Sequence, residues 1–134
     1  MDNKSLMAEA IKAREYSHSP YSHFAVGAAL LTKSGRVFTG CNVENLSYRL
    51  TMCAEQGAVS AAVAQGEREF VAIAVVADAA RPIVPCGACR QVLAEFNPKM
   101  RVIMGTLKGQ EETMSLEQLL PRPAEGILEV SKDV

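Results

Sequence analysis

Residues 70–77 read FVAIAVVA, and this apolar run is the strongest structural signal in the sequence. A strand that is apolar at every position is typical of the centre of a sheet whose two faces are both covered. The run is much shorter than the roughly 20 apolar residues that cross a membrane as a helix. The sequence therefore predicts a buried central strand with a layer of structure on each side.

Helical and strand patterns alternate on both sides of this strand. Helices are predicted over residues 4–16, 54–65, 86–96 and 115–120, and strands over residues 26–32, 36–41 and 101–105. Asn3 or Ser5 is expected to cap the first helix and Gly66 to end the second, while Ser115 and Gln118 have the spacing of a capping box. We expect residues 1–134 to form a single layered α/β domain.

Composition excludes several classes of protein. The 134 residues are 49% hydrophobic and 22% charged, as in an ordinary soluble domain. The net charge is −1 and aromatic residues make up 5%, so we expect no nucleic-acid partner, which would need basic or stacking surfaces. The first residues, MDNKSLMAEA, lack the apolar core of a signal peptide. We therefore expect a cytoplasmic location and no membrane partner.

The chain has four cysteines: Cys41, Cys53, Cys86 and Cys89. The last two lie in the motif PCGAC (residues 85–89), which has three interpretations. A thioredoxin-like redox pair usually follows an early strand, whereas this motif comes late. A structural zinc site needs four ligands and would use all four cysteines. A catalytic zinc site needs only three thiolates and keeps one position open.

The residues around the cysteines favour the open, three-ligand site. Cys53 and Cys86 each start a predicted helix, and helix N-termini favour thiolates over thiols. Glu55 lies in the first turn of its helix, where a carboxylate can carry a proton between water and a substrate. Alone, Glu55 is more simply explained as a helix-start charge. CAE (53–55) followed by PCGAC, however, matches the signature of zinc deaminases.

From about Tyr16 to Pro121 the chain resembles the small homotetrameric cytidine deaminases of the three-cysteine type. The resemblance is carried by SPYS (19–22), FAVGA (24–28), GCNVEN (40–45), Tyr48, CAE (53–55), PCGACRQ (85–91) and LLP (119–121). It implies a three-layer α/β/α fold around a five-stranded mixed sheet. It also implies hydrolytic deamination of cytidine and deoxycytidine with release of ammonia, in pyrimidine salvage, by a homotetramer whose active sites lie at subunit interfaces.

The resemblance also implies a chemical role for the residues of the two cysteine motifs. Cys53, Cys86 and Cys89 would bind one zinc ion per subunit, and Glu55 would be the proton shuttle. Cys41 is not a ligand in such a family, and we interpret it as a small buried apolar residue.

Five further residues are implied to bind the nucleoside substrate. Asn42 and Glu44 would bind the ribose, chiefly its 3′-hydroxyl, and Phe24 would pack against the base. The backbone of Ala54 would touch the pyrimidine edge, and Tyr48 would reach the pocket of a neighbouring subunit. Without the resemblance, Asn42 and Glu44 are better explained as surface polar groups at the end of a strand, and Phe24 as a core residue. His18 and His23 lack metal-like spacing and are interpreted as surface loop residues.

Three positions depart from the pattern of the family. Gln56 stands where relatives commonly have Arg, and we expect Arg90 to compensate for the missing charge. Leu46 stands where relatives often have Ala. The segment LLPRPA (119–124) replaces LLPGAF, so the aromatic residue that closes over the base is missing unless Ile127 or Leu128 substitutes for it.

These departures leave alternative functions open. One is a related deaminase that acts on modified or N4-substituted cytidines or on a blasticidin-like aminopyrimidine. The pair Asn42 and Glu44 resembles a ribose-binding pair and so argues against the blasticidin-like substrate. Another is a structural zinc-binding domain with four cysteine ligands, in which Glu55 would have no chemical role.

Overall fold

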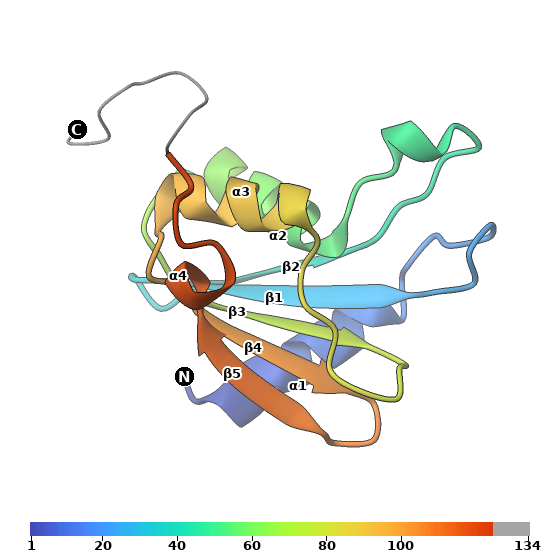
Figure 1. The fold of residues 1–134 in the computed structure, drawn as a ribbon, viewed down its shortest axis with the longest axis horizontal. Coiled ribbons are helices and arrows are strands. Elements are labelled where there is room, and N and C mark those ends of the chain that lie inside the picture. Colours follow the sequence, from blue (N-terminus) through green and yellow to red (C-terminus); the bar gives the residue numbers. More distant parts are fainter. Residues whose placement is uncertain (125–134) are drawn as a thin grey trace.

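In the computed structural model, which describes residues 1–124, one mixed sheet organises the chain (Figure 1). Its strands are β1 (Val26–Thr32), β2 (Val37–Cys41), β3 (Phe70–Ala77), β4 (Arg101–Thr106) and β5 (Glu111–Ser115). They are ordered β2-β1-β3-β4-β5, and β3 and β4 are parallel while the other neighbours are antiparallel. The predicted five-stranded mixed sheet is therefore confirmed.

Strand β3 is the centre of the sheet, as its apolar sequence predicts. Ala74 pairs with Ala29 of β1 on one side and with Ile103 of β4 on the other. Every residue of β3 except Val71 is buried. Because side chains alternate along a strand, Ile73 and Val75 enter one core cluster and Ala72, Ala74 and Val76 enter the other.

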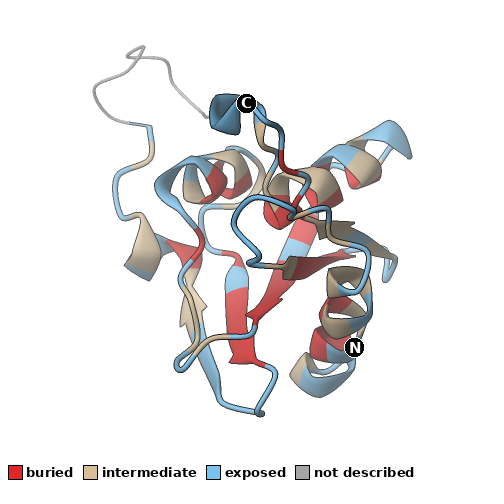
Figure 2. Cartoon of the chain, turned by 90° about the vertical axis from the view of Figure 1, so that its right-hand side faces the viewer, coloured by how far each residue is buried: buried red, intermediate tan, exposed pale blue. Residues whose placement is uncertain are grey.

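Helices cover both faces of the sheet. Helix α1 (Asn3–Arg14) packs on one face through Leu6, Met7 and Ala10. Helices α2 (Ala54–Ala64) and α3 (Gly87–Phe96) lie on the opposite face, and the short α4 (Leu116–Leu119) follows β5. Burial is concentrated in the strands and on the helix sides that face them (Figure 2). The predicted three-layer α/β/α arrangement is confirmed. Over residues 1–124, no helix combines the length and the apolar character needed to cross a bilayer.

The observed elements differ from the predicted ones in a few places. The cap of α1 is Asp2, whose Oδ1 accepts the backbone N–H of Ser5 at 2.8 Å, and neither Asn3 nor Ser5 has this role. Strand β5 was not predicted from the pattern of residues, because its segment EETMS is polar and lies at an exposed edge. A 3-10 turn, η1 (Tyr48–Leu50), also lies in a segment without a predicted element.

Two segments extend from the same end of the sheet (Figure 1). One is the loop of residues 15–25 between α1 and β1. The other, residues 42–52, contains η1, and we call it the arm. The arm is closed at its base by paired backbone hydrogen bonds between Val43 and Met52, both 2.9 Å. The loop and the arm are joined by a bridge between His18 and Val43.

Strand β2 and helix α2 touch through their backbones at Gly40. A Cβ atom on Gly40 would lie 2.3 Å from the carbonyl oxygen of Ala54 and 2.6 Å from the backbone nitrogen of Ala58. Gly57 lies across the same contact, but a Cβ atom there would have its nearest neighbour at 3.7 Å, an ordinary van der Waals distance. The absence of a side chain at Gly40 thus sets how closely the first turn of α2 approaches the sheet.

We expect Gly40→Ala to lower the free energy of unfolding by about 1–3 kcal/mol, since backbone atoms block the added methyl group. Gly57→Ala is the matched control. It should raise the free energy of unfolding by up to about 1 kcal/mol, because alanine favours a helix interior and the space is available. Urea denaturation at one protein concentration measures both. A Gly40→Ala protein that unfolds at the wild-type midpoint would contradict this account of the contact.

Candidate active site

Three of the four cysteines meet where two helices begin. Cys53 is the N-cap residue of α2, Cys86 is the N-cap residue of α3, and Cys89 lies in the first turn of α3. Their sulfur atoms all lie within 4.8 Å of one another, and the Cys86 and Cys89 sulfurs are 3.4 Å apart. Cys41 is not part of this cluster, and it is partly rather than fully buried, so the expectation of a buried position was wrong.

The cluster has the size and the chemistry of a zinc site. Thiolates bind zinc at about 2.3 Å in a tetrahedral arrangement, which places the sulfur atoms about 3.8 Å from one another. The observed spacing therefore fits one ion with small adjustments of the side chains. Three thiolate ligands leave a fourth coordination position open, which is typical of catalytic rather than structural zinc.

The surroundings of the cluster favour deprotonated sulfur. Hydrogen bonds from Cys89 and then Cys86 lower the pKa of Cys53 to about 6, against the opposing effect of burial. Cys89, which donates to Cys53 and is fully buried, has a raised pKa in this pair. Two helix N-termini point their positive dipole ends at the same place. The first thiolate thus forms readily, and a bound cation would stabilise the other two.

Glu55 is a buried carboxyl group beside the sulfur cluster. It lies in the first turn of α2 and is 4% exposed. Burial raises the pKa of Glu55 to about 7, and the negative charge of Cys53 adds to the shift. A carboxyl group with this pKa can both accept and donate a proton near neutral pH, as a general acid–base catalyst must.

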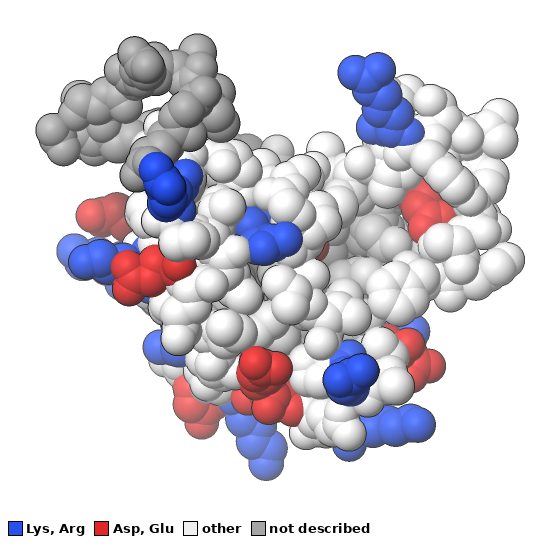
Figure 3. All heavy atoms as spheres, in the orientation of Figure 1, with Lys and Arg blue, Asp and Glu red and all other residues white. Residues whose placement is uncertain are grey.

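The cluster and Glu55 open into one cavity of about 210 Å³. Asn42, Ala54, Glu55 and the three cysteines line one part of it. The remaining lining residues are mostly apolar: Val26, Thr51, Ile83, Val84 and Pro85. Val26 and Pro85 belong to the stretches FAVGA and PCGAC, whereas Thr51, Ile83 and Val84 lie outside the predicted elements and motifs and were not identified from the sequence. On the face shown in Figure 3, the surface is hollowed between the helical layer and the arm, and charges of both signs are interspersed around it.

Asn42 and Glu44 are both buried, but only Asn42 lines the cavity. The Asn42 amide donates to the carbonyl oxygen of Phe24 at 2.9 Å and accepts the backbone N–H of Val26 at 2.9 Å and the Ser17 hydroxyl. Glu44 instead faces the 15–25 loop, and the hydrogen bond from the Ser22 hydroxyl is the main cause of its lowered pKa. Both side chains thus fasten the loop to the base of the arm.

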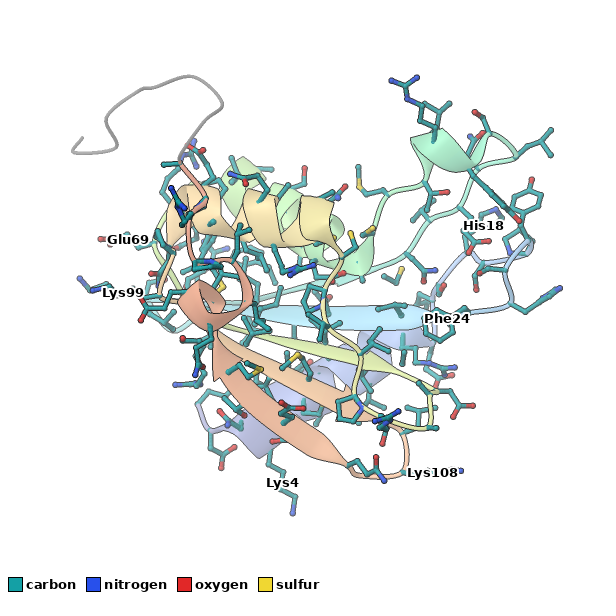
Figure 4. All side chains as sticks on the ribbon, viewed as in Figure 1. Lys4, His18, Phe24, Glu69, Lys99 and Lys108 are labelled. Carbon is teal, nitrogen blue, oxygen red and sulfur yellow. The ribbon has the colours of Figure 1, made fainter. Side chains whose placement is uncertain are left out.

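Phe24 and Tyr48 lie outside the lining of this cavity. Phe24 is exposed near the end of the 15–25 loop, just before β1, and the same loop carries His18 (Figure 4). Tyr48 is 64% exposed on the arm and packs edge-on against Tyr21, with ring centroids 5.9 Å apart. Leu46, also on the arm, is 81% exposed. His18 and His23 are exposed loop residues, as predicted.

Gln56 and Arg90, the two residues considered for the charge at the sulfur cluster, have different hydrogen-bond partners. Gln56 donates from Nε2 toward the Cys89 sulfur at 3.6 Å, so the amide reaches the cluster directly. Arg90, expected to compensate, instead donates from Nη1 to the carbonyl oxygen of Leu119 at 2.8 Å. Its buried Nε has no hydrogen-bond partner among residues 1–124. Ile127 and Leu128, considered as substitutes for a closing aromatic residue, lie outside the described residues.

Comparison with known proteins agrees with this geometry. The profile of the "Cytidine and deoxycytidylate deaminase zinc-binding region" matches residues 1–106. The chain is 53% identical over 122 residues to a cytidine deaminase of Halalkalibacterium halodurans, covering 90% of this chain and 92% of that protein. It is 52% identical over 122 residues to a cytidine deaminase of Sporosarcina psychrophila, covering 90% of each.

A solved structure shares both the fold and the sequence. The crystal structure of cytidine deaminase from Burkholderia pseudomallei superposes with a TM-score of 0.88 at 49% identity, covering 90% of this chain and 98% of that one. The profile match spans both cysteine motifs, and the identities extend over nearly the whole chain. On these grounds, the protein belongs to the cytidine and deoxycytidylate deaminase family.

Proposed function

We propose that this protein hydrolyses cytidine and deoxycytidine to uridine and deoxyuridine, with release of ammonia, and that it uses one zinc ion per subunit. The observation that carries the proposal is the buried carboxyl group of Glu55 beside three convergent thiols in a single cavity. Relatives named cytidine deaminases, at 53% and 52% identity, support the choice of substrate.

Each residue of the site has a part in the proposed reaction. Cys53, Cys86 and Cys89 would hold the zinc ion, which when bound would lower the pKa of a water molecule and so supply a nucleophile near neutral pH. Glu55 accepts a proton from the water that attacks C4 of the base and gives one to N3. It then takes the second proton of that water from the hydroxyl group now bonded to C4 and passes it to the amino group. The C4–N bond breaks, ammonia leaves, and the hydroxyl oxygen becomes the C4 carbonyl of the uracil product. Burial suits Glu55 to this task, because its pKa of about 7 lets both protonation states be populated.

The substrate is proposed to enter along the apolar wall of the cavity. The backbone of Ala54 contacts the pyrimidine edge, Phe24 packs against the base, and Asn42 and Glu44 bind the ribose. The cavity of about 210 Å³ is smaller than the roughly 300–1,000 Å³ of pockets that enclose small ligands. One subunit therefore has room for the base, and we propose that a neighbouring subunit completes the enclosure of the nucleoside.

The arm supports the proposal of a homotetramer with active sites at its interfaces. Leu46, Tyr48 and Leu50 are each more than 60% exposed, and Val43 and Met52 are also exposed. An apolar group of this kind next to a cavity is typical of a surface that another protein covers. In this arrangement Tyr48 reaches the pocket of a neighbour. We also propose a cytoplasmic role in pyrimidine salvage, since all four cysteines are free thiols, which suits a reducing compartment.

Glu55→Gln tests the proposed chemistry. The zinc-loaded wild-type protein should release ammonia from cytidine, and the variant should be slower by about 100-fold or more, because the amide cannot transfer protons. Glu9→Gln, at a carboxylate on the outside of α1, is the control and should keep wild-type activity. Ammonia release that persists at the wild-type rate in Glu55→Gln would rule out the proton shuttle. No release from a folded, zinc-bound wild-type protein would overturn the proposed reaction.

The three-ligand site differs from a four-cysteine structural site in its response to serine substitutions. We expect Cys53→Ser and Cys89→Ser to reduce bound zinc well below one ion per chain, and Cys41→Ser to leave it unchanged, because Cys41 lies outside the sulfur cluster. Metal analysis of the purified proteins gives the stoichiometry. Loss of zinc from Cys41→Ser would support the structural alternative instead.

Gln56→Arg places a positive charge where the glutamine amide now meets the Cys89 sulfur. A positive charge favours deprotonated forms of nearby groups, so the acidic limb of the pH–rate profile should move to lower pH. Gln65→Arg, at the C-terminal end of the same helix, makes the same change of charge away from the sulfur cluster and should leave the profile in place. An acidic limb that does not move in Gln56→Arg would show that a positive charge at this position does not act on the group that controls the limb.

A further inference from the structure

The carboxylate of Glu44 is almost fully occupied by the 15–25 loop. Its Oε1 accepts the backbone N–H groups of Tyr21 and Ser22, both at 3.1 Å, and its Oε2 accepts the Ser22 hydroxyl. An ionised carboxylate accepts about four hydrogen bonds. Three are therefore already made within the chain, and the remaining acceptor position is on Oε2.

Ser22 is the side chain that fixes Oε2. The hydroxyl donates its only hydrogen to Glu44, and its oxygen accepts the backbone N–H of Phe24 at 3.0 Å. A directed chain of hydrogen bonds thus runs from the Phe24 backbone through Ser22 to Glu44. It joins the residue proposed to pack against the base to the residue proposed to bind the sugar.

The turn that carries Ser22 is itself tightly specified. His23, between Ser22 and Phe24, has a φ angle of +57°, a left-handed conformation that non-glycine residues seldom adopt. Its backbone N–H donates to the carbonyl oxygen of Ser19 at 3.1 Å. Asn42 holds the end of the loop through Phe24 and Val26. Backbone strain kept in place by several hydrogen bonds is characteristic of functional sites.

We propose that Ser22 is a positioning residue for sugar recognition: its hydroxyl orients the Glu44 carboxylate so that one free acceptor position on Oε2 receives a ribose hydroxyl. The proposal rests on the proposed function, in which Glu44 binds the sugar, chiefly at its 3′-hydroxyl. The carboxylate has room for one donor and no more, so it selects one hydroxyl in one direction.

The experiment compares Ser22→Ala with the wild-type enzyme on two substrates, cytidine and 3′-deoxycytidine. Without the hydroxyl, kcat/KM for cytidine should fall about 10-fold, the size expected for one hydrogen bond to a charged group, mainly through KM. For 3′-deoxycytidine the change should stay below about 2-fold, because the hydroxyl that Glu44 receives is already absent. Ser22→Thr keeps a hydroxyl and should restore most of the discrimination between the two substrates.

Ser34→Ala is the matched control, since Ser34 also donates to a glutamate, Glu67, at 3.0 Å, in the turn between β1 and β2. It should leave both substrates unaffected. If Ser22→Ala does not fold, Ser22→Cys, with a weaker donor of similar size, takes its place in the same comparison. Combining the Ser22 variant with Glu44→Gln tests whether Ser22 acts through Glu44. The loss of discrimination caused by the Ser22 variant should then be less than additive with the loss caused by Glu44→Gln.

The outcomes separate this proposal from the proposed function. An equal loss on cytidine and 3′-deoxycytidine, or no loss on either, overturns the role of Ser22 and leaves the deaminase activity standing. Additive losses in the double variant also overturn it, because Ser22 would then act independently of Glu44. A wild-type enzyme that releases no ammonia from cytidine overturns the proposed function and the role of Ser22 together.

Discussion

Two helices begin at nearly the same point, and the rest of the site depends on that constraint. Cys53 and Cys86 are separated by a helix, a strand and a connecting segment, yet they cap α2 and α3 on the same face of the sheet. Three sulfur atoms within 4.8 Å require the two helices to lie side by side with matching starts. Helix α2 can approach this closely because Gly40 has no side chain. Helix α3 is held on the same face by Leu93, which packs into the shared core.

The chemistry of the site follows from the close packing of titratable groups, the three thiols and the Glu55 carboxyl group. Glu55 enters the interior because it belongs to the same first turn that places Cys53, and burial then raises its pKa. The sulfur atoms lie at two helix N-termini, hydrogen-bond to one another and accept a hydrogen bond from the Gln56 amide. A metal cation in the cluster would satisfy the negative charge that these helix ends already favour. One turn of helix thus supplies a ligand, a proton carrier and a donor to sulfur.

The parts of the molecule that depend on local sequence patterns can be predicted from the sequence. The central strand of residues 70–77 follows from an unbroken apolar run. The meeting of Cys53 with Cys86 and Cys89 is expected because CAE and PCGAC match the signature of zinc deaminases. Strand β5 could not be found this way, because an edge strand with polar residues has no apolar alternation. Gly109, with a φ angle of +90°, marks the turn before β5 and is the signal that could have suggested a hairpin.

Other features depend on contacts between distant segments and have no local signature. The hydrogen bond from Ser22 to Glu44 forms only when the 15–25 loop lies against the arm. The direction of the Arg90 side chain depends on the position of Leu119, whose carbonyl oxygen accepts its hydrogen bond. The roles of Phe24, Asn42, Glu44 and Tyr48 toward a nucleoside stay predictions, as does the extent of a single domain over residues 1–134.

The parallel pairing of β3 with β4 has a consequence for the order of folding. Helix α3 is the crossover between these strands, so the pairing of β4 with β3 fixes both ends of the segment that carries Cys86 and Cys89. Cys53 arrives separately, with the helix that precedes β3. Contacts of this kind, distant along the chain, form late and slowly. A metal ion that binds only the assembled cluster stabilises the folded state, so with zinc in excess the bound metal per chain also measures the fraction of chains that have completed folding.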